Sequence, residues 1–423
     1  MQKPVDEIDY FTDKEVLKDP YTYFDNMRAL GPVAQLKSRD MVLVTGFKEC
    51  VEVLMNTADF SSVNSPVPTQ PLPFEPIGDD ISDQIEANRG KFARGDILVS
   101  ADGPKHAAFR SLMTVLFTPS RLKANEDYMN QLSEELVREA VSKGHCELVK
   151  ELAVPYVTMV IADVLGIPPE DRETFRREID AGPPIIGAMD SRVTRQIEPW
   201  QFMRPFFEGY IADRRANPRP DVLTEFANAR YPDGSLPDTE DLINNAQFLF
   251  GAGQDTSAKL LGNSMRFLVT DLELQARLRE DRSLIPALLE EVLRLEGSTK
   301  STFRIARRKT RIGDVEVPAG KTVIVALAAA NRDPVRWDNP HEFRLKREKI
   351  KEHLAFGRGA HTCIGNPLAR AEIKVILNHL FDQTTEITLS EKYHGTPGKW
   401  IFNYEPTYII RGLQELQLEL KRS

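Results

Sequence analysis

The 423-residue sequence predicts a mainly α-helical fold with a minor β portion near both ends. From about residue 104 to residue 280, apolar side chains recur at three- and four-residue spacing, as in residues 132–140, 156–165 and 260–268. This spacing is typical of amphipathic helices. Residues 303–327 instead read as short strands around a turn. Because no linker divides the chain, we expect a single domain that spans residues 1–423.

The N-terminal region mixes short elements. The pattern predicts a helix over Tyr21–Leu30, a strand over Met41–Val44 and a second helix over Phe47–Met55. Five prolines then fall within residues 65–76, which excludes regular helix there. A loop of this length is either a functional lid or a plain connector.

A second irregular segment interrupts two helical patterns. Residues 181–189 read Ala-Gly-Pro-Pro-Ile-Ile-Gly-Ala-Met, an apolar hinge. Such a hinge could cover the mouth of a pocket or form a packed turn between helices, and the residues leave both readings open.

Composition limits the class of protein. The net charge of −8, from 55 basic and 63 acidic residues, argues against nucleic acid as a partner. The three cysteines are widely spaced and odd in number, as in a reduced compartment. The first residues lack the apolar core of a signal peptide, and no run of about 18 apolar residues predicts a membrane span. We therefore expect a monomeric cytoplasmic protein without membrane contact.

The most informative stretch surrounds Cys363. Gly357 and Gly359 precede it and allow backbone angles that bring the chain close to a flat ligand. Pro367 then suits the first turn of a helix. Because Cys363 lies near the positive end of that helix dipole, we expect its thiolate form to be favoured. Such a thiol is a metal ligand or a nucleophile.

The number of nearby ligands narrows the metal. Zinc and iron–sulfur clusters need about four protein ligands, and here one cysteine has one nearby histidine, His361. Haem needs only one thiolate, because the porphyrin supplies the in-plane ligands. A nucleophilic cysteine would need a well-placed base, and His361 is only two residues away in a loop. The residues leave open a haem ligand, a nucleophile and an inert cysteine.

A second candidate segment lies inside a long helical pattern. Gly251 and Gly253 are costly in a helix, so they suggest close backbone approach or a local kink. The adjacent acid–alcohol pair, Asp255 and Thr256, could relay protons to a bound oxygen species. Alternatively, the Thr256 hydroxyl bonds back to a helix carbonyl while Asp255 is solvated. A dinucleotide fingerprint is excluded because Thr256 replaces the third glycine.

These motifs resemble those of the cytochrome P450 family, the haem-thiolate monooxygenases. The signature loop is matched by Phe356-x-x-Gly359-x-x-x-Cys363-x-Gly365, the oxygen-side segment by residues 252–256, and the Glu-x-x-Arg pair by Glu291 and Arg294. Their order and spacing fit the family, and the resemblance covers essentially all 423 residues. It implies a triangular helical domain with a small β-rich region.

The resemblance also implies roles for individual residues. Cys363 is the expected axial ligand of haem b, while Thr256 steadies bound oxygen and Asp255 helps to deliver protons. Ten residues are expected to bind the cofactor: His106, Arg110, Ala252, Gly253, Arg304, Phe356, Gly357, His361, Cys363 and Gly365. Four of them are expected to bind the haem propionates: His106, Arg110, Arg304 and His361. Glu291 and Arg294 form the expected buried structural pair, and the sequence leaves His341 and Arg347 as candidates for its third member.

An apolar pocket with a few hydroxyl groups is expected above the haem. Its expected lining residues are Phe74, Leu98, Ile186, Phe248, Leu249, Ala252, Ser298, Thr299, Thr302 and Phe402. This lining suits a hydrophobic small molecule, such as a terpenoid, an aromatic or a fatty compound.

We expect hydroxylation with O2 and two electrons from an external [2Fe-2S]-type ferredoxin and its NAD(P)H-dependent reductase. A basic patch near the Cys363 side could steer an acidic ferredoxin; it comprises Lys105, the run Arg307-Arg308-Lys309, Arg358, Arg370 and Lys374. Two alternatives remain: a peroxide-driven hydroxylase or decarboxylase, and a non-catalytic haem carrier or sensor. The intact pair of Asp255 and Thr256 argues against both.

Overall fold

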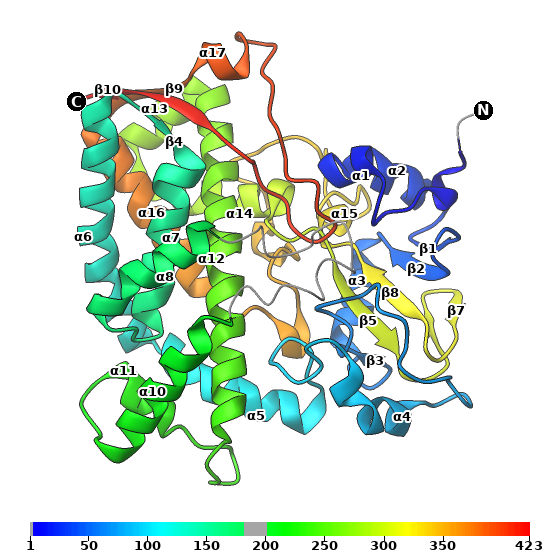
Figure 1. The fold of residues 1–423 in the computed structure, drawn as a ribbon. Helices are drawn as coiled ribbons and strands as arrows, with labels where there is room; N and C mark the ends of the chain where they lie inside the picture. The colour runs from blue at the N-terminus through cyan, green and yellow to red at the C-terminus, as the bar shows by residue number, and fades with distance from the viewer. Residues whose placement is uncertain (1–2, 182–200) are drawn as a thin grey trace.

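The protein, described by a computed structural model over residues 3–181 and 201–423, has a large helical part beside a smaller β-rich part (Figure 1). The helices are α1 Lys14–Lys18, α2 Tyr21–Leu30, α3 Phe47–Met55, α4 Ser82–Ala87, α5 Gly103–Thr114, α6 Pro119–Lys143, α7 Val154–Val164, α8 Pro169–Ala181, α10 Met203–Ala216, α11 Val222–Ala227, α12 Thr239–Thr270, α13 Leu272–Glu280, α14 Ile285–Glu296, α15 Leu327–Ala330, α16 Asn366–Gln383 and α17 Glu391–His394. The strands are β1 Val33–Leu36, β2 Met41–Val44, β3 Phe60–Ser61, β4 His145–Glu147, β5 Thr302–Ala306, β6 Thr310–Ile312, β7 Val315–Val317, β8 Thr322–Val325, β9 Thr384–Leu389 and β10 Gln417–Arg422.

The sequence predictions agree with this architecture. Helices α2 and α3 and strand β2 have the predicted bounds. The proline-rich residues 65–76 contain neither helix nor strand. Most of the hinge, from residue 182 to residue 189, lies outside the described residues. Within the described ranges, no helix has both the length and the apolar character needed to cross a membrane.

The larger sheet has the strand order β1-β2-β8-β5-β3, and its inner strands β2 and β8 are buried on both faces. Side chains alternate along a strand, and the two faces of β2 join different cores. Val42 and Val44 pack in the cluster that includes α3, whereas Leu43 packs in the cluster that includes α2. Strand β8 pairs with β2 in parallel, Val42 opposite Val323. The sheet is thereby fixed between two helices.

Helix α12 runs through the middle of the molecule, with α6, α7 and α16 packed together on one side (Figure 1). It is 32 residues long and continues unbroken through both glycines. At Gly253, an added Cβ would lie 3.2 Å from Cδ1 of Ile161 on α7. Glycine therefore permits the close approach of α7 and α12 that the sequence suggested.

The C-terminal segment joins the two parts. Strand β10 pairs with β9 and with β4, a three-residue strand that the local pattern did not predict. Before β10, a loop over residues 403–414, which we call the C-terminal loop, folds back on itself. The Gln414 amide donates to the Asn403 carbonyl at 2.9 Å, and the Glu405 amide donates to the Gly412 carbonyl at 3.0 Å.

Candidate active site

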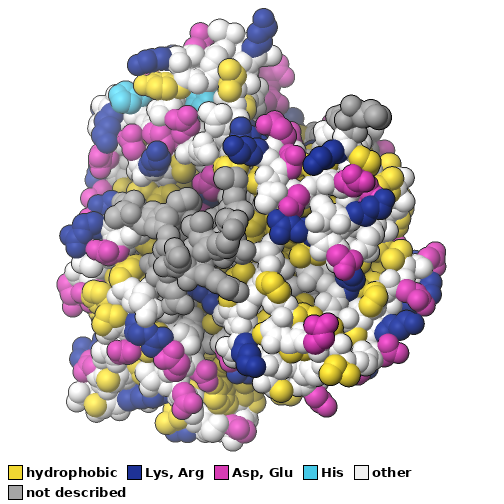
Figure 2. All heavy atoms as spheres, turned by 45° about the vertical axis from the view of Figure 1, so that its right-hand side comes forward, with side chains coloured by type: hydrophobic (Ala, Val, Ile, Leu, Met, Phe, Trp, Pro, Cys, Tyr) yellow, Lys and Arg dark blue, Asp and Glu magenta, His cyan; other side chains and the backbone are white. Residues whose placement is uncertain are grey.

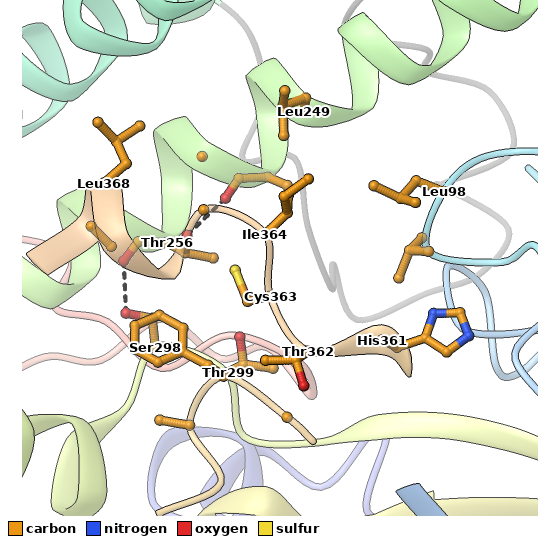
Figure 3. A pocket seen from close by; sticks show the side chains of 18 of the residues that line it. Leu98, Leu249, Thr256, Ser298, Thr299, His361, Thr362, Cys363, Ile364 and Leu368 are labelled. Atoms are coloured by element: carbon orange, nitrogen blue, oxygen red, sulfur yellow. Dashed lines mark hydrogen bonds between the residues drawn. The ribbon is translucent and has the colours of Figure 1, made fainter. Parts of the chain in front are cut away.

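A cavity of about 290 Å³ lies between α12, α5, residues 298–304 and the loop that carries Cys363. All ten residues expected to bind the cofactor line it: His106, Arg110, Ala252, Gly253, Arg304, Phe356, Gly357, His361, Cys363 and Gly365. Thr256 also lines it, and Figure 3 shows Cys363 beneath the α12 residues Leu249 and Thr256. Segments far apart in the sequence therefore meet around one thiol.

The shape of the Cys loop, residues 356–365, depends on its glycines. Gly357 and Gly359 have φ angles of 66° and 77°, in the left-handed region that favours glycine. At Gly359 an added Cβ would lie 2.8 Å from the Leu54 carbonyl oxygen of α3, so only glycine fits. The loop closes where the Cys363 amide donates to the Phe356 carbonyl at 2.9 Å. This geometry leaves the thiol exposed to the cavity.

The ionisation of Cys363 differs from the sequence expectation. Burial raises the pKa of the thiol, and this effect outweighs the opposing main-chain N–H groups of Gly365 and Asn366 at the start of α16. The positive charges of Arg110 and Arg370 also oppose it without reversing it. The helix end alone therefore does not favour the thiolate, because desolvation destabilises the thiolate more than the helix dipole stabilises it. A bound metal cation would supply the missing stabilisation.

Four cationic or potentially cationic side chains form one wall of the cavity. This cationic wall consists of His106, Arg110, Arg304 and His361, and the two imidazole rings are 4.0 Å apart. Burial, followed by the neighbouring charges, lowers the pKa of His361 to about 2, so its ring is neutral. Burial also lowers the pKa of Arg304 to about 10.

Anionic groups are scarce among the described residues that line the cavity. Among the described lining residues, Glu372 is the sole carboxylic acid, and burial raises its pKa to about 8. The buried His106 Nε2 has no hydrogen-bond partner within the described protein. A ligand with two carboxylates at this wall would satisfy both the positive charge and the unpaired nitrogen. The residues present therefore fit haem, whose propionates are such carboxylates and whose iron accepts a thiolate.

On the opposite side of the cavity, the Thr256 hydroxyl donates to the Ala252 carbonyl at 2.7 Å. This is the back-bonded geometry that the sequence left open, yet the side chain still lines the cavity. The Ser298 hydroxyl donates in turn to the Thr256 carbonyl at 2.7 Å, and Figure 3 marks the contact. Asp255 does not line the cavity and is largely buried instead of solvated, with its carboxylate 3.6 Å from the Lys259 ammonium. Burial raises the pKa of Asp255.

Most of the expected substrate residues line the cavity: Leu98, Phe248, Leu249, Ala252, Ser298, Thr299 and Thr302. Two lie elsewhere. The Phe74 ring packs edge-on against Phe92, 6.4 Å between centroids, in a separate small core. Phe402 lies 5.7 Å from the His394 ring. Both rings bury apolar area against their own segments, so neither is available to the cavity. Ile186 lies outside the described residues.

The structural pair has a definite third member. Arg294 donates to both carboxylate oxygens of Glu291, at 2.9 and 2.8 Å, and neither side chain is exposed. Arg347 adds an ion pair to Glu291 at 3.0 Å. His341 instead lies 3.4 Å from Asp25 at the surface. Of the two candidates, the tertiary structure selects Arg347.

Two residues of the site escaped the sequence analysis. Glu372 faces the cavity from α16, on a helix face that is otherwise apolar, and a lone acid on such a face was its only signal. Lys259 follows Asp255 by four residues, a spacing that places both on one side of a helix. That spacing could have identified Lys259.

Comparison with known proteins agrees with this geometry. The sequence profile of the family described as Cytochrome P450 matches residues 77–385. The substrate-free structure of cytochrome P450 CYP150A6 from Mycobacterium marinum is 43% identical, with a TM-score of 0.92 over 99% of this chain and 100% of that one. Cytochrome P450 144 of Mycobacterium tuberculosis is 29% identical over 97% of this chain and 91% of its own.

A further solved relative is CYP109E1 from Bacillus megaterium in complex with corticosterone. It is 26% identical, with a TM-score of 0.80 over 96% of this chain and 100% of that one. The family profile covers well over half of the chain, and the solved relatives share its fold from end to end. This chain therefore belongs to the cytochrome P450 family, the oxidoreductases that carry thiolate-ligated haem b and act as monooxygenases.

Proposed function

We propose that the chain, acting as one catalytic domain, hydroxylates a hydrophobic small molecule of the terpenoid, aromatic or fatty type. The observation that carries this proposal is the cavity itself, because it joins the Cys363 thiol to a largely apolar chamber. Leu98, Phe248 and Leu249 supply apolar surface, while Ser298 and Thr299 supply hydroxyl groups that could orient a polar substituent. The corticosterone complex of CYP109E1 supports a substrate of this general kind.

In this proposal, the Cys363 thiolate would hold the haem iron, and the cationic wall would hold the two propionates. Haem bound in this way supplies the iron at which dioxygen is activated with two electrons, one oxygen atom going to the product and the other to water. The apolar chamber binds the substrate and excludes bulk water, which strengthens the remaining electrostatic interactions.

The protein's own part in oxygen activation is the movement of protons. Asp255 is the proposed proton donor, and Thr256 is the hydroxyl that would hold the last proton at the cavity. While it donates to the Ala252 carbonyl, the Thr256 oxygen can still accept a hydrogen bond at the cavity, and it would donate a proton there only after turning away from that carbonyl.

We propose that electrons come from a ferredoxin. The expected basic patch offers less free charge than its sequence suggests. Arg370 pairs with Glu290 at 2.5 Å, Lys105 pairs with Asp96 at 2.7 Å, and Arg308 pairs with Asp80 at 3.2 Å. Figure 2 shows basic and acidic side chains interspersed over the face that it draws. A docking site on the Cys363 side would therefore depend mainly on Arg358 and Lys374, which form no ion pair within the described protein.

The test compares Thr256→Ala with Thr256→Ser, which keeps the hydroxyl. The assay uses a hydroxylatable substrate and a ferredoxin system. In Thr256→Ala, the fraction of electrons recovered in product should fall several-fold, and the other electrons should appear as hydrogen peroxide. Thr256→Ser should retain most of the coupling. Equal coupling in both variants would remove Thr256 from the mechanism. Turnover with hydrogen peroxide alone, at the rate of the ferredoxin system, would favour the peroxide-driven alternative.

The substrate class is best tested by a binding screen. In the haem-loaded protein, a substrate that enters the cavity should change the spin state of the haem iron and thereby the haem absorbance. Terpenoid, aromatic and fatty compounds should produce this change, whereas small hydrophilic compounds should not. A panel in which no hydrophobic compound binds would contradict the proposal and favour a haem carrier or sensor.

A further inference from the structure

One lysine on α12 lies between two carboxylates. The Lys259 ammonium is 3.6 Å from the Asp255 carboxylate and forms a closer ion pair with Glu405 in the C-terminal loop. The Lys259 side chain is 6% exposed, and those of Asp255 and Glu405 are 19% and 20% exposed. We call these three residues the acid–lysine triad. With all three ionised, one positive charge is shared by two negative charges in a partly desolvated site.

The C-terminal loop packs closely around the Lys259 side chain. An added Cβ at Gly412 would lie 2.1 Å from Cδ and 2.6 Å from Cγ of Lys259, so the lysine stem passes directly over the glycine. The Glu405 amide donates to the carbonyl of the same glycine at 3.0 Å. Gly412 has no positive φ that would explain its identity. The C-terminal loop therefore holds both the stem of Lys259 and its carboxylate partner.

The other cations near the triad already have partners of their own. Lys300, the next cation to act on Glu405, is fully buried and donates to two main-chain carbonyls. Arg411 pairs with Glu296 at 2.9 Å. Within the described residues, Lys259 is the cation that pairs with Asp255.

The charge count has a consequence for titration. Two carboxylates that share one ammonium cannot both stay ionised without cost where water is largely excluded, so their protons titrate as a coupled pair. Burial raises the pKa of Asp255 and that of Glu405, and Lys259 opposes both increases. Moving Lys259 or removing the Glu405 charge would therefore change the pH at which Asp255 holds a proton.

We propose that Lys259 and Glu405 are positioning residues for proton delivery: together, seated on Gly412, they set the protonation of Asp255. The inference rests on the proposed role of Asp255 as proton donor. The C-terminal loop lies some 150 residues along the chain from Asp255. The inference gives this loop a part in setting when Asp255 holds a proton.

The test uses two variants that act in opposite directions. In Lys259→Met, Asp255 loses its cation, so its protonation midpoint should move to higher pH by about 1 unit or more. In Glu405→Gln, Asp255 loses a competing negative charge and keeps the whole ammonium, so its midpoint should move to lower pH. Both midpoints are measured in the haem-loaded protein from the infrared band of the protonated carboxyl group, which Asp255→Asn assigns. The pH profile of coupling should follow the same two directions.

A third variant leaves the chemistry of the triad intact. Gly412→Ala should displace the Lys259 stem and move the midpoint to higher pH, as Lys259→Met does but by a smaller amount. Gly209→Ala is the matched control, because an added Cβ there meets nothing within 4 Å. Gly412→Ala also keeps the test decisive if Lys259→Met does not fold.

The outcomes distinguish the inference about Lys259 and Glu405 from the proposed role of Asp255 on which it rests. Opposite shifts for Lys259→Met and Glu405→Gln would support it, with no shift in Gly209→Ala. Unchanged midpoints and coupling in all triad variants, together with lost coupling in Asp255→Asn, would overturn the inference and leave the proposed function standing. Full coupling in Asp255→Asn would instead remove Asp255 from proton delivery.

Discussion

Two groups of buried charge in this protein have different kinds of partner. Around Glu291, every nearby guanidinium has a partner: Arg294 donates to both carboxylate oxygens and to main-chain carbonyls, and Arg347 completes the network. In the cationic wall, by contrast, positive groups face a cavity whose one described carboxylic acid, Glu372, has its pKa raised to about 8. In the first group the carboxylate belongs to the chain itself, whereas Arg110 and Arg304 in the second donate to main-chain carbonyls and form no ion pair within the described residues.

The difference teaches how to separate structural charges from binding charges. Buried polar groups are nearly always paired within a protein, so an unpaired atom such as His106 Nε2 points to something that the protein binds. Both groups contain arginines at low exposure, so burial alone would not tell them apart. The four predictions below test the contrast.

The largest expected effect concerns the ligand that completes the site. Cys363→Ser should abolish the carbon-monoxide difference band of thiolate-ligated haem, because a serine oxygen does not replace the sulfur donor. The matched control is Cys146→Ala, which alters a buried cysteine away from the cavity. An unchanged spectrum in Cys363→Ser would show that another residue binds the iron.

The next largest effect should come from the satisfied network. Glu291→Ala leaves Arg294 buried without its carboxylate, and breaking such a pair costs about 3–5 kcal/mol of unfolding free energy. The measurement is denaturant unfolding. The control is Glu134→Ala, which removes an exposed pair with Arg138 and should cost at most about 1 kcal/mol. Similar losses of unfolding free energy in both variants would show that the buried Glu291 network stabilises the protein no more than an exposed ion pair does.

The cationic wall should respond with opposite signs in the presence and absence of haem. The double variant His106→Ala with Arg110→Ala should release haem about 100-fold faster, because two charge-assisted hydrogen bonds of about 1.5 kcal/mol or more are lost. Without haem, Arg304→Met should stabilise the protein by about 1–3 kcal/mol, since it removes a buried guanidinium that donates to the Phe303 carbonyl and to the Ser65 hydroxyl but forms no ion pair within the described residues. Haem-transfer kinetics and unfolding of the haem-free protein measure the two effects. A loss of stability in haem-free Arg304→Met would show that these hydrogen bonds outweigh the cost of burying the charge.

The fourth prediction concerns Glu372 and the pH dependence of stability. Its pKa is raised from the usual 4.5 to about 8 by burial, so the folded protein keeps a proton that the unfolded chain releases. Stability should therefore fall as pH rises between these two values, by up to about 1.4 kcal/mol per pH unit. Glu372→Gln, which resembles the protonated acid, should reduce this slope in unfolding experiments across the same pH range. Identical slopes for the variant and the natural protein would mean that Glu372 is ionised in the folded state.

The triad shows the same contrast at a smaller scale. Its single lysine is enough for one carboxylate and not for two. The triad therefore neither has a cation for each carboxylate, as the Glu291 network does, nor lacks ion pairs within the described residues, as the arginines of the cationic wall do. That intermediate state suits a group that must gain and lose a proton.

The sequence by itself determined the features that lie within one short segment. The glycines, thiol and helix start of the Cys loop, the acid–alcohol pair on α12 and the elements α2, β2 and α3 all follow from local spacing. Local spacing is reliable here because backbone angles and side-chain direction repeat over a few residues. The same rule would also have revealed Lys259, four residues after Asp255.

Only the tertiary structure decided which distant groups meet. It selected Arg347 over His341, placed Phe74 and Phe402 away from the cavity, and brought Glu405 to Lys259. It also decided that burial outweighs the helix end at Cys363. The physical reason is that desolvation and long-range pairing depend on the whole surroundings of a group, which no stretch of neighbouring residues specifies.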